Sequence, residues 1–214
     1  MINFHNCDNM QFMADVPDKY YDLAIVDPPY GIERLKKINK GDKIHKASDS
    51  GKNYNNNKPS SIYFDELFRV SKNQIIWGAN NFVLPTSEYF CIWDKKQGYP
   101  NFARCEYAFV SMGLKKPAKI FEHGIHQYLN QSKIHPTQKP VALYEWLLSK
   151  YAKPNDKIFD SHGGSGSIAI AVDKANTLDK TNYSLDIIEL DKDYFDASVN
   201  RFNKYKSQTT LNLK

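Results

Sequence analysis

The sequence has few residues of the kinds that build disulfide frameworks or metal sites. Its three cysteines are far apart and form no CxxC pair, and its six histidines show no metal-ligand spacing beside a cysteine or carboxylate cluster. The composition therefore predicts neither disulfides nor a bound metal. It is typical of a reduced, cytoplasmic protein.

Long apolar runs are also missing. Residues 1–10 are polar and lack the basic start and apolar stretch of a signal peptide. No apolar run approaches the length of a membrane span. Hydrophobic residues make up 41% of the chain and charged residues 25%, which is ordinary for a globular protein. For 214 residues we expect a single domain, residues 1–214, that does not contact a membrane.

The net charge is +5, and the basic residues are unevenly distributed. Residues 31–60 hold eight lysines and arginines against three acids, and residues 92–133 hold seven against three. Such an excess suits a phosphate backbone, although a solvated loop explains a single charged run equally well. We expect residues 31–60 to be a long mobile basic loop. Residues 85–133, rich in aromatic residues and lysines, are expected to be an insertion that recognises a partner.

Short apolar segments alternate with amphipathic ones along most of the chain. Continuous apolar runs bounded by turn residues predict buried strands of a parallel sheet. A 3.6-residue period predicts helices, and Asp191 can cap the last of them. This alternation predicts an α/β fold with a doubly wound sheet. The expected strands are 23–26, 74–78, 89–93, 106–110, 157–160 and 183–190, and the expected helices follow Pro140, Gly166 and Asp191.

Asp27-Pro28-Pro29-Tyr30 follows the first expected strand, at the end where open α/β sheets bind ligands. The prolines remove backbone donors and fix φ, which predicts a rigid corner with unpaired carbonyls, a carboxylate and an aromatic ring. Asp27 and a backbone carbonyl are suited to accept the two N–H bonds of an amine on a flat ring that stacks on Tyr30. The alternative is a turn that merely ends the strand.

Two further segments have the composition of a binding site. Residues 159–166 read Phe-Asp-Ser-His-Gly-Gly-Ser-Gly between a strand and a helix, where glycines let the backbone approach a cofactor and helix amides favour polar groups. Glu189 ends a later strand, the usual place of an acid that binds ribose hydroxyls. Residues 135–140, His-Pro-Thr-Gln-Lys-Pro, form a stiff, donor-rich segment before a helix. A tight turn and a surface proline turn are the alternatives.

Together these segments resemble the amino methyltransferases of DNA, in the circularly permuted group called beta. In that group the DPPY motif comes first, and HPTQKP and the glycine-rich cofactor motif follow the recognition region. The resemblance covers nearly the whole chain, from Asn6 to Phe202, and includes Trp93-Asp94-Lys95 and residues 102–106. The family's cofactor loop commonly reads D-P-F-x-G-S-G. Here Ser161 and His162 replace the proline and phenylalanine.

The resemblance implies a Rossmann-like methyltransferase sheet, mostly parallel with an antiparallel edge strand, and a small recognition insertion. It implies methyl transfer from S-adenosylmethionine to the exocyclic amine of a base flipped out of DNA, without a metal. The implied catalytic residues are Asp27, Pro28, Pro29 and Tyr30. The cofactor would be bound by Asp8 at its adenine, Glu189 at its ribose, and Asp27, Thr137, Lys139, Asp160, His162, Gly164 and Gly166.

Three other functions stay open on the sequence. Cytosine N4 methylation uses the same fold, but its motif more often begins with serine, so Asp27 favours adenine N6. Methylation of RNA or of a small molecule would use the same cofactor fold, and the basic loop counts against a small molecule. A catalytically silent DNA-binding module fits the altered Ser161 and His162, whereas the intact DPPY motif argues against it. We therefore expect an adenine-specific DNA methyltransferase, which could pair as a homodimer as other members do.

Overall fold

The structure is a computed structural model that describes residues 1–31, 58–98, 100, 103–124, 134–135 and 137–212. Residues 32–57, most of the expected mobile basic loop, lie outside the described residues, and so do residues 125–133 of the expected insertion. In the described part of the chain, no helix combines the length and apolar character needed to cross a bilayer.

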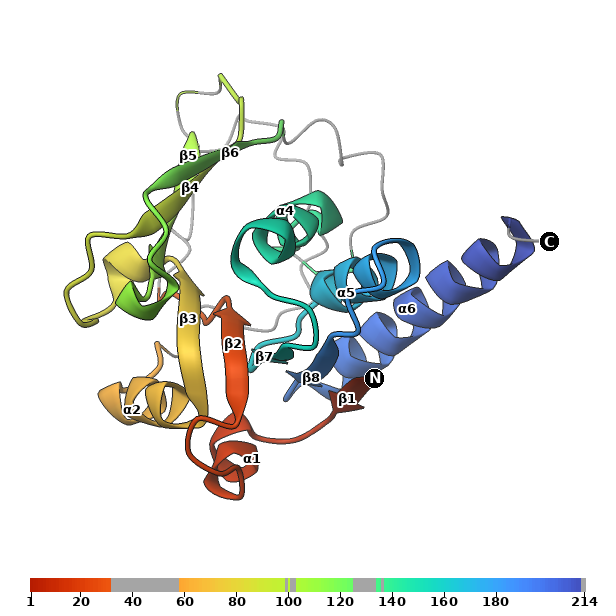
Figure 1. The fold of residues 1–214 in the computed structure, drawn as a ribbon, viewed down its shortest axis with the longest axis horizontal. Coiled ribbons are helices and arrows are strands. Elements are labelled where there is room, and N and C mark those ends of the chain that lie inside the picture. The colour runs from red at the N-terminus through yellow and green to blue at the C-terminus, as the bar shows by residue number, and fades with distance from the viewer. Residues whose placement is uncertain (32–57, 99, 101–102, 125–133, 136, 213–214) are drawn as a thin grey trace, which may run out of the picture.

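An eight-stranded sheet forms the centre of the molecule, in the order β1-β8-β7-β2-β3-β5-β4-β6 (Figure 1). Strand β5 is antiparallel to both of its neighbours, and the other pairings are parallel. The strands are β1 (Ile2–His5), β2 (Tyr21–Val26), β3 (Ser71–Trp77), β4 (Phe90–Asp94), β5 (Cys105–Val110), β6 (Lys119–Glu122), β7 (Lys157–Asp160) and β8 (Ser184–Ile188).

The predicted Rossmann-like α/β class is confirmed, but the antiparallel strand does not lie at an edge. Strand β5 pairs with β4 on one side and with β3 on the other, antiparallel to both, so it lies inside the sheet. Strands β4 and β6 extend the sheet beyond it, and the edges are formed by β1 and β6. The strands of the expected insertion, residues 85–133, thus continue the central sheet.

Helices cover both faces of the sheet (Figure 1). Side chains alternate along β2, so Leu23 and Ile25 join the apolar cluster on one face, whereas Ala24 and Val26 join the cluster on the other. The helices on the first face are α4 (Val141–Tyr151), α5 (Ser167–Leu178) and α6 (Lys192–Asn212), and those on the second are α1 (Asn9–Ala14) and α2 (Ser61–Val70). The chain also forms two short 3₁₀ helices, η1 (Ala79–Asn81) and η2 (Met112–Leu114).

The parallel strands β1, β8, β7 and β2 end at the same edge of the sheet. The chain leaves β2 at Asp27 and β7 at Ser161, and Glu189 follows β8. Asp191 then accepts hydrogen bonds from the backbone amides of Asp193 and Tyr194, which caps the start of α6 as predicted. The DPPY corner, the glycine loop and Glu189 therefore begin at one edge of the sheet.

Candidate active site

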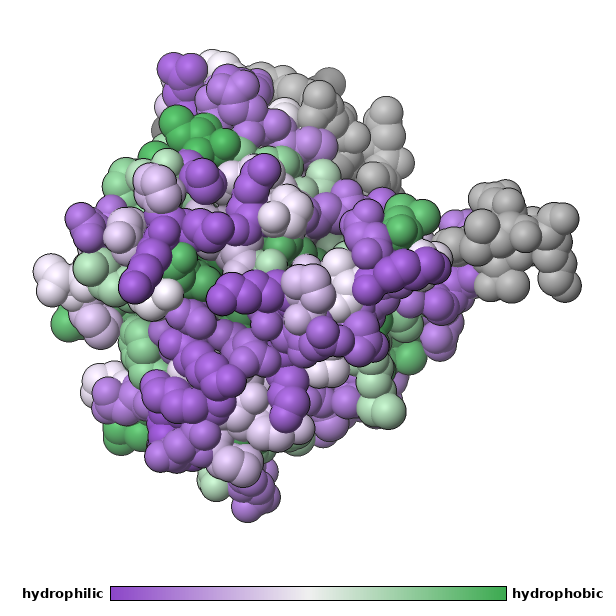
Figure 2. All heavy atoms as spheres, viewed as in Figure 1, coloured by the Kyte–Doolittle hydropathy of each residue, from purple (hydrophilic) through white to green (hydrophobic). Residues whose placement is uncertain are grey.

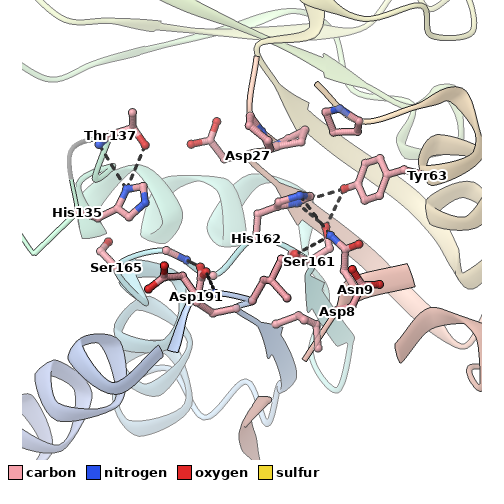
Figure 3. Close-up of a pocket in the computed structure, with 18 of the residues that line it drawn as sticks. Asp8, Asn9, Asp27, Tyr63, His135, Thr137, Ser161, His162, Ser165 and Asp191 are labelled. Carbon is pink, nitrogen blue, oxygen red and sulfur yellow. Dashed lines mark hydrogen bonds between the residues drawn. The ribbon is translucent and has the colours of Figure 1, made fainter. Parts of the chain in front are cut away.

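A cavity of about 830 Å³ lies at this edge, within the range of small-molecule sites. The DPPY corner, the glycine loop, His135 and residues 137–139 all contribute to its wall, and Figure 3 shows side chains from each of these segments around the same space. The sequence-predicted residues that line it are Asp8, Asp27, Pro28, Pro29, Tyr30, Thr137, Lys139, His162, Gly164 and Glu189.

Two expected cofactor residues do not line the cavity. Asp160 is 1% exposed, and its carboxylate accepts a hydrogen bond from the backbone amide of His162 (3.0 Å). Gly166 precedes α5 with a φ of +67°, and a side-chain carbon there would lie 3.2 Å from Ser198 and 3.5 Å from Phe4. Glycine at position 166 thus lets the start of α5 pack closely against α6 and β1.

The DPPY corner is held in one conformation by hydrogen bonding and packing. The hydroxyl of Tyr30 donates to Oδ1 of Asp27 (2.6 Å). The Tyr30 ring lies so close to Gly78 that a side-chain carbon at position 78 would overlap it, and Gly78 also has a positive φ of +66°. Burial, with the charges of Asp27 and Glu106, raises the pKa of Tyr30, so its hydroxyl remains a donor. The corner is therefore rigid before any ligand arrives.

The ammonium group of Lys139 lies between two carboxylates. It is 2.5 Å from Oδ2 of Asp27 and 3.1 Å from Oε2 of Glu106, and Oε1 of Glu106 is 2.7 Å from the ammonium of Lys95. Burial by itself lowers the pKa of Lys139, but Asp27 and Glu106 outweigh it and raise that pKa, so the ammonium stays charged. For Glu106, the charges of Lys139 and Lys95 overcome burial and lower its pKa below the usual carboxyl range. The cluster thus consists of two cations and two anions.

Glu106 and Gly78 are site residues that the sequence reasoning missed. Glu106 precedes Ala108 and Val110 at two-residue spacing on β5, and both of these are fully buried. An acid that continues a buried row of a strand was a usable signal, because such an acid needs a partner. The sequence gives no comparable signal for Gly78, whose role depends on the packing of a distant ring.

On the opposite side of the cavity, Glu189 fixes the glycine loop. Its carboxylate accepts hydrogen bonds from the backbone amides of Gly164 (2.8 Å) and Asp191 (2.9 Å). The amide of Gly163 donates to the carbonyl of Ile188 at the end of β8 (2.7 Å). The loop is therefore tied to the strand that precedes Glu189, and its glycine backbone faces the cavity.

His162 occupies the position where the resembling family commonly has phenylalanine. Asn9 donates its amide hydrogens to Nε2 of His162 and to the carbonyl of Ser161 (3.2 Å each), and Nδ1 of His162 lies 2.9 Å from Oγ of Ser161. The ring of Tyr63 contacts the imidazole edge-on, with 5.3 Å between centroids (Figure 3). Burial lowers the pKa of His162 to about 4, so the imidazole is neutral at pH 7. Its acceptor nitrogen is occupied, which fits a wall residue better than a base.

Among the residues that the structure describes, acids outnumber bases around the cavity. The described lysines that line it are Lys139, whose charge is balanced by two carboxylates, and Lys192, which pairs with Asp196. The acids that line it are Asp8, Asp27, Glu106, Glu189, Asp191 and Asp193. Within the described residues, no group of three or more potential metal ligands is found. The charge balance favours a ligand that carries positive charge and hydrogen-bond donors.

Comparison with known proteins gives a consistent result. The family model described as DNA methylase matches residues 45–200. The chain is 24% identical to the type II methyltransferase M.BglII of Bacillus subtilis, over 91% of this chain and 67% of that protein. It is 23% identical to the type II methyltransferase M.HinfI of Haemophilus influenzae, over 93% and 67% respectively.

Solved structures share the fold. The M1.HpyAVI–SAM complex is 20% identical, with a TM-score of 0.59, and the match covers 94% of this chain and 100% of that one. The PvuII DNA methyltransferase, described as cytosine-N4-specific, is 14% identical with a TM-score of 0.60, over 94% and 86% of the two chains.

Proposed function

The chain belongs to the DNA methylase family, and from this premise we propose that it transfers a methyl group from S-adenosylmethionine to the exocyclic amine of a base in DNA, with adenine N6 as the target. The observation that carries the proposal is the meeting of the DPPY corner and the glycine loop around one cavity. Asp27 lines this cavity from the end of β2, and Gly164 lines it from the loop after β7. A base and a nucleoside cofactor can therefore meet there.

The charge of the cavity supports this cofactor. S-adenosylmethionine carries a sulfonium and an ammonium group, and the surplus of acids among the described residues of the cavity favours such a ligand. We assign Glu189 to the ribose hydroxyls and Asp8 to the adenine. Oδ1 of Asp8 accepts the backbone amides of Met10 and Gln11 at the start of α1, which fixes its carboxylate at the wall. Thr137 and Gly164 line the part of the cavity assigned to the methionine portion.

The target amine must leave the duplex, because it is otherwise paired and out of reach. When bound, the sulfonium supplies an activated methyl group. The carboxylate of Asp27 and the carbonyl of Pro28 accept the two N–H bonds of the amine, which directs the nitrogen lone pair away from the base ring and towards the methyl group. Tyr30 provides the face on which the base stacks. Positioning is thus the main contribution of these residues.

Cytosine N4 methylation is the second candidate. One structure with the same fold is described as cytosine-N4-specific. Against it stands the first residue of the motif, because the resembling cytosine enzymes more often begin with serine where this chain has Asp27.

We assign DNA contact to the basic loop and to residues 85–133. Within the described part, Lys95 and Lys96 pair with acids of the same sheet, so they are poor candidates for binding phosphate. Lys115 and Lys116 are exposed and better suited to it. A homodimer stays a prediction.

The test is to incubate the purified protein with isotope-labelled S-adenosylmethionine and unmethylated genomic DNA, and to analyse the nucleosides by mass spectrometry. We expect labelled N6-methyldeoxyadenosine. Labelled N4-methyldeoxycytidine would support the second candidate. If the protein binds the cofactor but no labelled nucleoside forms, the methyltransferase assignment is wrong, and a catalytically silent DNA-binding module is the remaining alternative.

A further inference from the structure

Strand β5 carries one carboxylate, Glu106, to the cavity from the segment that we expected to recognise DNA. Glu106 continues the buried row of Ala108 and Val110, because side chains alternate along a strand. Its two oxygens face different cations, Oε2 at 3.1 Å from Lys139 and Oε1 at 2.7 Å from Lys95. The carboxylate is therefore fixed both by its strand and by its partners.

Lys139 has little freedom to leave its position. Its side chain is 4% exposed, and its backbone carbonyl accepts a hydrogen bond from the hydroxyl of Ser167 (2.8 Å). Its ammonium lies 5.5 Å from the centroid of the Trp77 ring, and it reaches Oδ2 of Asp27 at 2.5 Å and the hydroxyl of Tyr30 at 3.3 Å. A buried cation with such neighbours is held by the carboxylates around it.

The hydrogen bonds of Asp27 leave part of its acceptor capacity open. A carboxylate has about four lone-pair sites. Tyr30 uses one on Oδ1, and Lys139 uses one on Oδ2. The remaining sites are those that the amine of a target base needs, and their direction depends on where Lys139 holds the carboxylate.

Resting on the proposed function, we propose that Glu106 is a positioning residue for methyl transfer. By pairing with the ammonium of Lys139 from its other side, it fixes the place of that cation against Asp27, so the catalytic carboxylate keeps its orientation and its open acceptor sites. Without Glu106, Asp27 would be the remaining carboxylate partner of Lys139 among the described residues. The buried ammonium would then compete with the amine of the base. Lys139 thus acts through Asp27 on the part of the cavity that binds the base.

The test compares two variants of the full-length protein. Glu106→Gln keeps the size of the side chain and loses its charge, whereas Glu106→Asp keeps the charge and is one methylene shorter. We expect E106Q to lower kcat for DNA methylation about tenfold or more, because small displacements of reacting groups are costly. Its Kd for S-adenosylmethionine, measured by calorimetry, should stay within about twofold of wild type, since Glu106 acts on the side of the base. E106D should be more active than E106Q, because a carboxylate at position 106 can still pair with the ammonium of Lys139.

A matched control is available on α2. Glu66 pairs with Arg69 (2.8 Å), and its side chain is 27% exposed, close to the 21% of Glu106, but it does not line the cavity. Glu66→Gln should leave kcat unchanged. Rates are expressed per cofactor-binding protein, so that partial unfolding of a variant does not imitate the effect.

Three results would overturn the assignment: E106Q as active as wild type, E106Q more active than E106D, or loss of cofactor binding in E106Q. A different result bears on the proposed function. If the wild-type protein binds S-adenosylmethionine but methylates no DNA, the enzyme assignment falls, and the role of Glu106 falls with it.

Discussion

At the scale of single residues, the charge of the cavity depends on groups whose ionisation is set by burial. Burial raises the pKa of the Asp160 carboxyl from 3.8 to about 7, and the negative charges of Asp27 and Glu189 act in the same direction. Burial lowers the pKa of His135 and of His162 to about 4. Between pH 6 and 8, Asp160 therefore changes its charge while both imidazoles stay neutral.

We predict that the affinity for S-adenosylmethionine rises as the pH increases from 6 to 8. Asp160 is protonated below about pH 7 and ionised above it, and the ionised form adds a negative charge directly behind His162, which lines the cavity assigned to the cationic cofactor. Calorimetric titrations at constant ionic strength measure this slope. Asp160→Asn should flatten the profile, and an unchanged slope in that variant would contradict the prediction.

The same shift has the opposite effect on the folded protein without ligand. A raised carboxyl pKa stabilises the fold fully below the ordinary value of 3.8, and this contribution is lost as the pH rises through about 7. At neutral pH the ionisation of Asp160 therefore lowers the stability of the free protein and adds a negative charge that a bound cation can interact with.

The site contains residues that are neighbours in the sequence and residues that are far apart, and only the former could be predicted together. Asp27 and Tyr30 belong to one short motif, and their chemistry could be predicted because they are neighbours. Tyr30 and Glu106 are 76 positions apart, and they meet because β5 lies beside β3. Such a meeting depends on strand order, which local sequence does not encode.

At the scale of elements, α1 and α2 build one wall of the cavity and are joined by one side chain. Arg69 of α2 donates to the backbone carbonyls of Met13 and Val16 at the end of α1 (2.7 Å each). Its guanidinium also pairs with Glu66 and Asp18. It thereby gives the carbonyls at and just after the end of α1 a charged hydrogen-bond donor.

We predict that Arg69→Met lowers the free energy of unfolding by about 2 kcal/mol, because it removes charged hydrogen bonds to these carbonyls. Lys72→Gln is the matched control. Lys72 pairs with Asp22, but its side chain is 54% exposed and solvent screens the pair, so its loss should lower the free energy of unfolding by clearly less than the loss of Arg69. Urea denaturation measures both values, and an equal loss in the two variants would contradict the account.

The predicted elements were those with a strong local pattern. The central strands could be predicted because their residues are continuously apolar, and α6 because Asp191 precedes an apolar stripe. Helix α2 was missed although its buried residues Tyr63, Leu67 and Val70 have helical spacing, because a basic polar stretch precedes it. The antiparallel strand was expected at an edge, whereas β5 lies inside the sheet, because the order of strands depends on pairing partners far along the chain.

At the scale of the whole molecule, the chain has a net charge of +5. The face in Figure 2 is mostly hydrophilic, and its apolar side chains form small separate patches. Lys115 and Lys116, between η2 and β6, are exposed at the strands that extend the sheet. Such a surface suits a polyanion whose phosphates are contacted by lysines.

We predict that binding to duplex DNA weakens steeply as salt is raised, because each lysine–phosphate contact releases a counterion. The double variant Lys115→Gln, Lys116→Gln should reduce the slope of log K against log salt by about 2. The control Lys150→Gln, Lys153→Gln removes two exposed lysines near the end of α4 and should leave the slope unchanged. Fluorescence anisotropy measures both, and equal slopes in the two double variants would contradict the assignment.

The account as a whole depends on Asp27 accepting a hydrogen bond from the amine of an extruded base beside the methyl donor. The most direct measurement is the rate of methyl transfer to DNA by Asp27→Ala at saturating S-adenosylmethionine. The account predicts a loss of about a hundredfold or more in a folded variant, which is the scale of a lost catalytic group. A folded Asp27→Ala protein that methylates DNA as fast as wild type would contradict it.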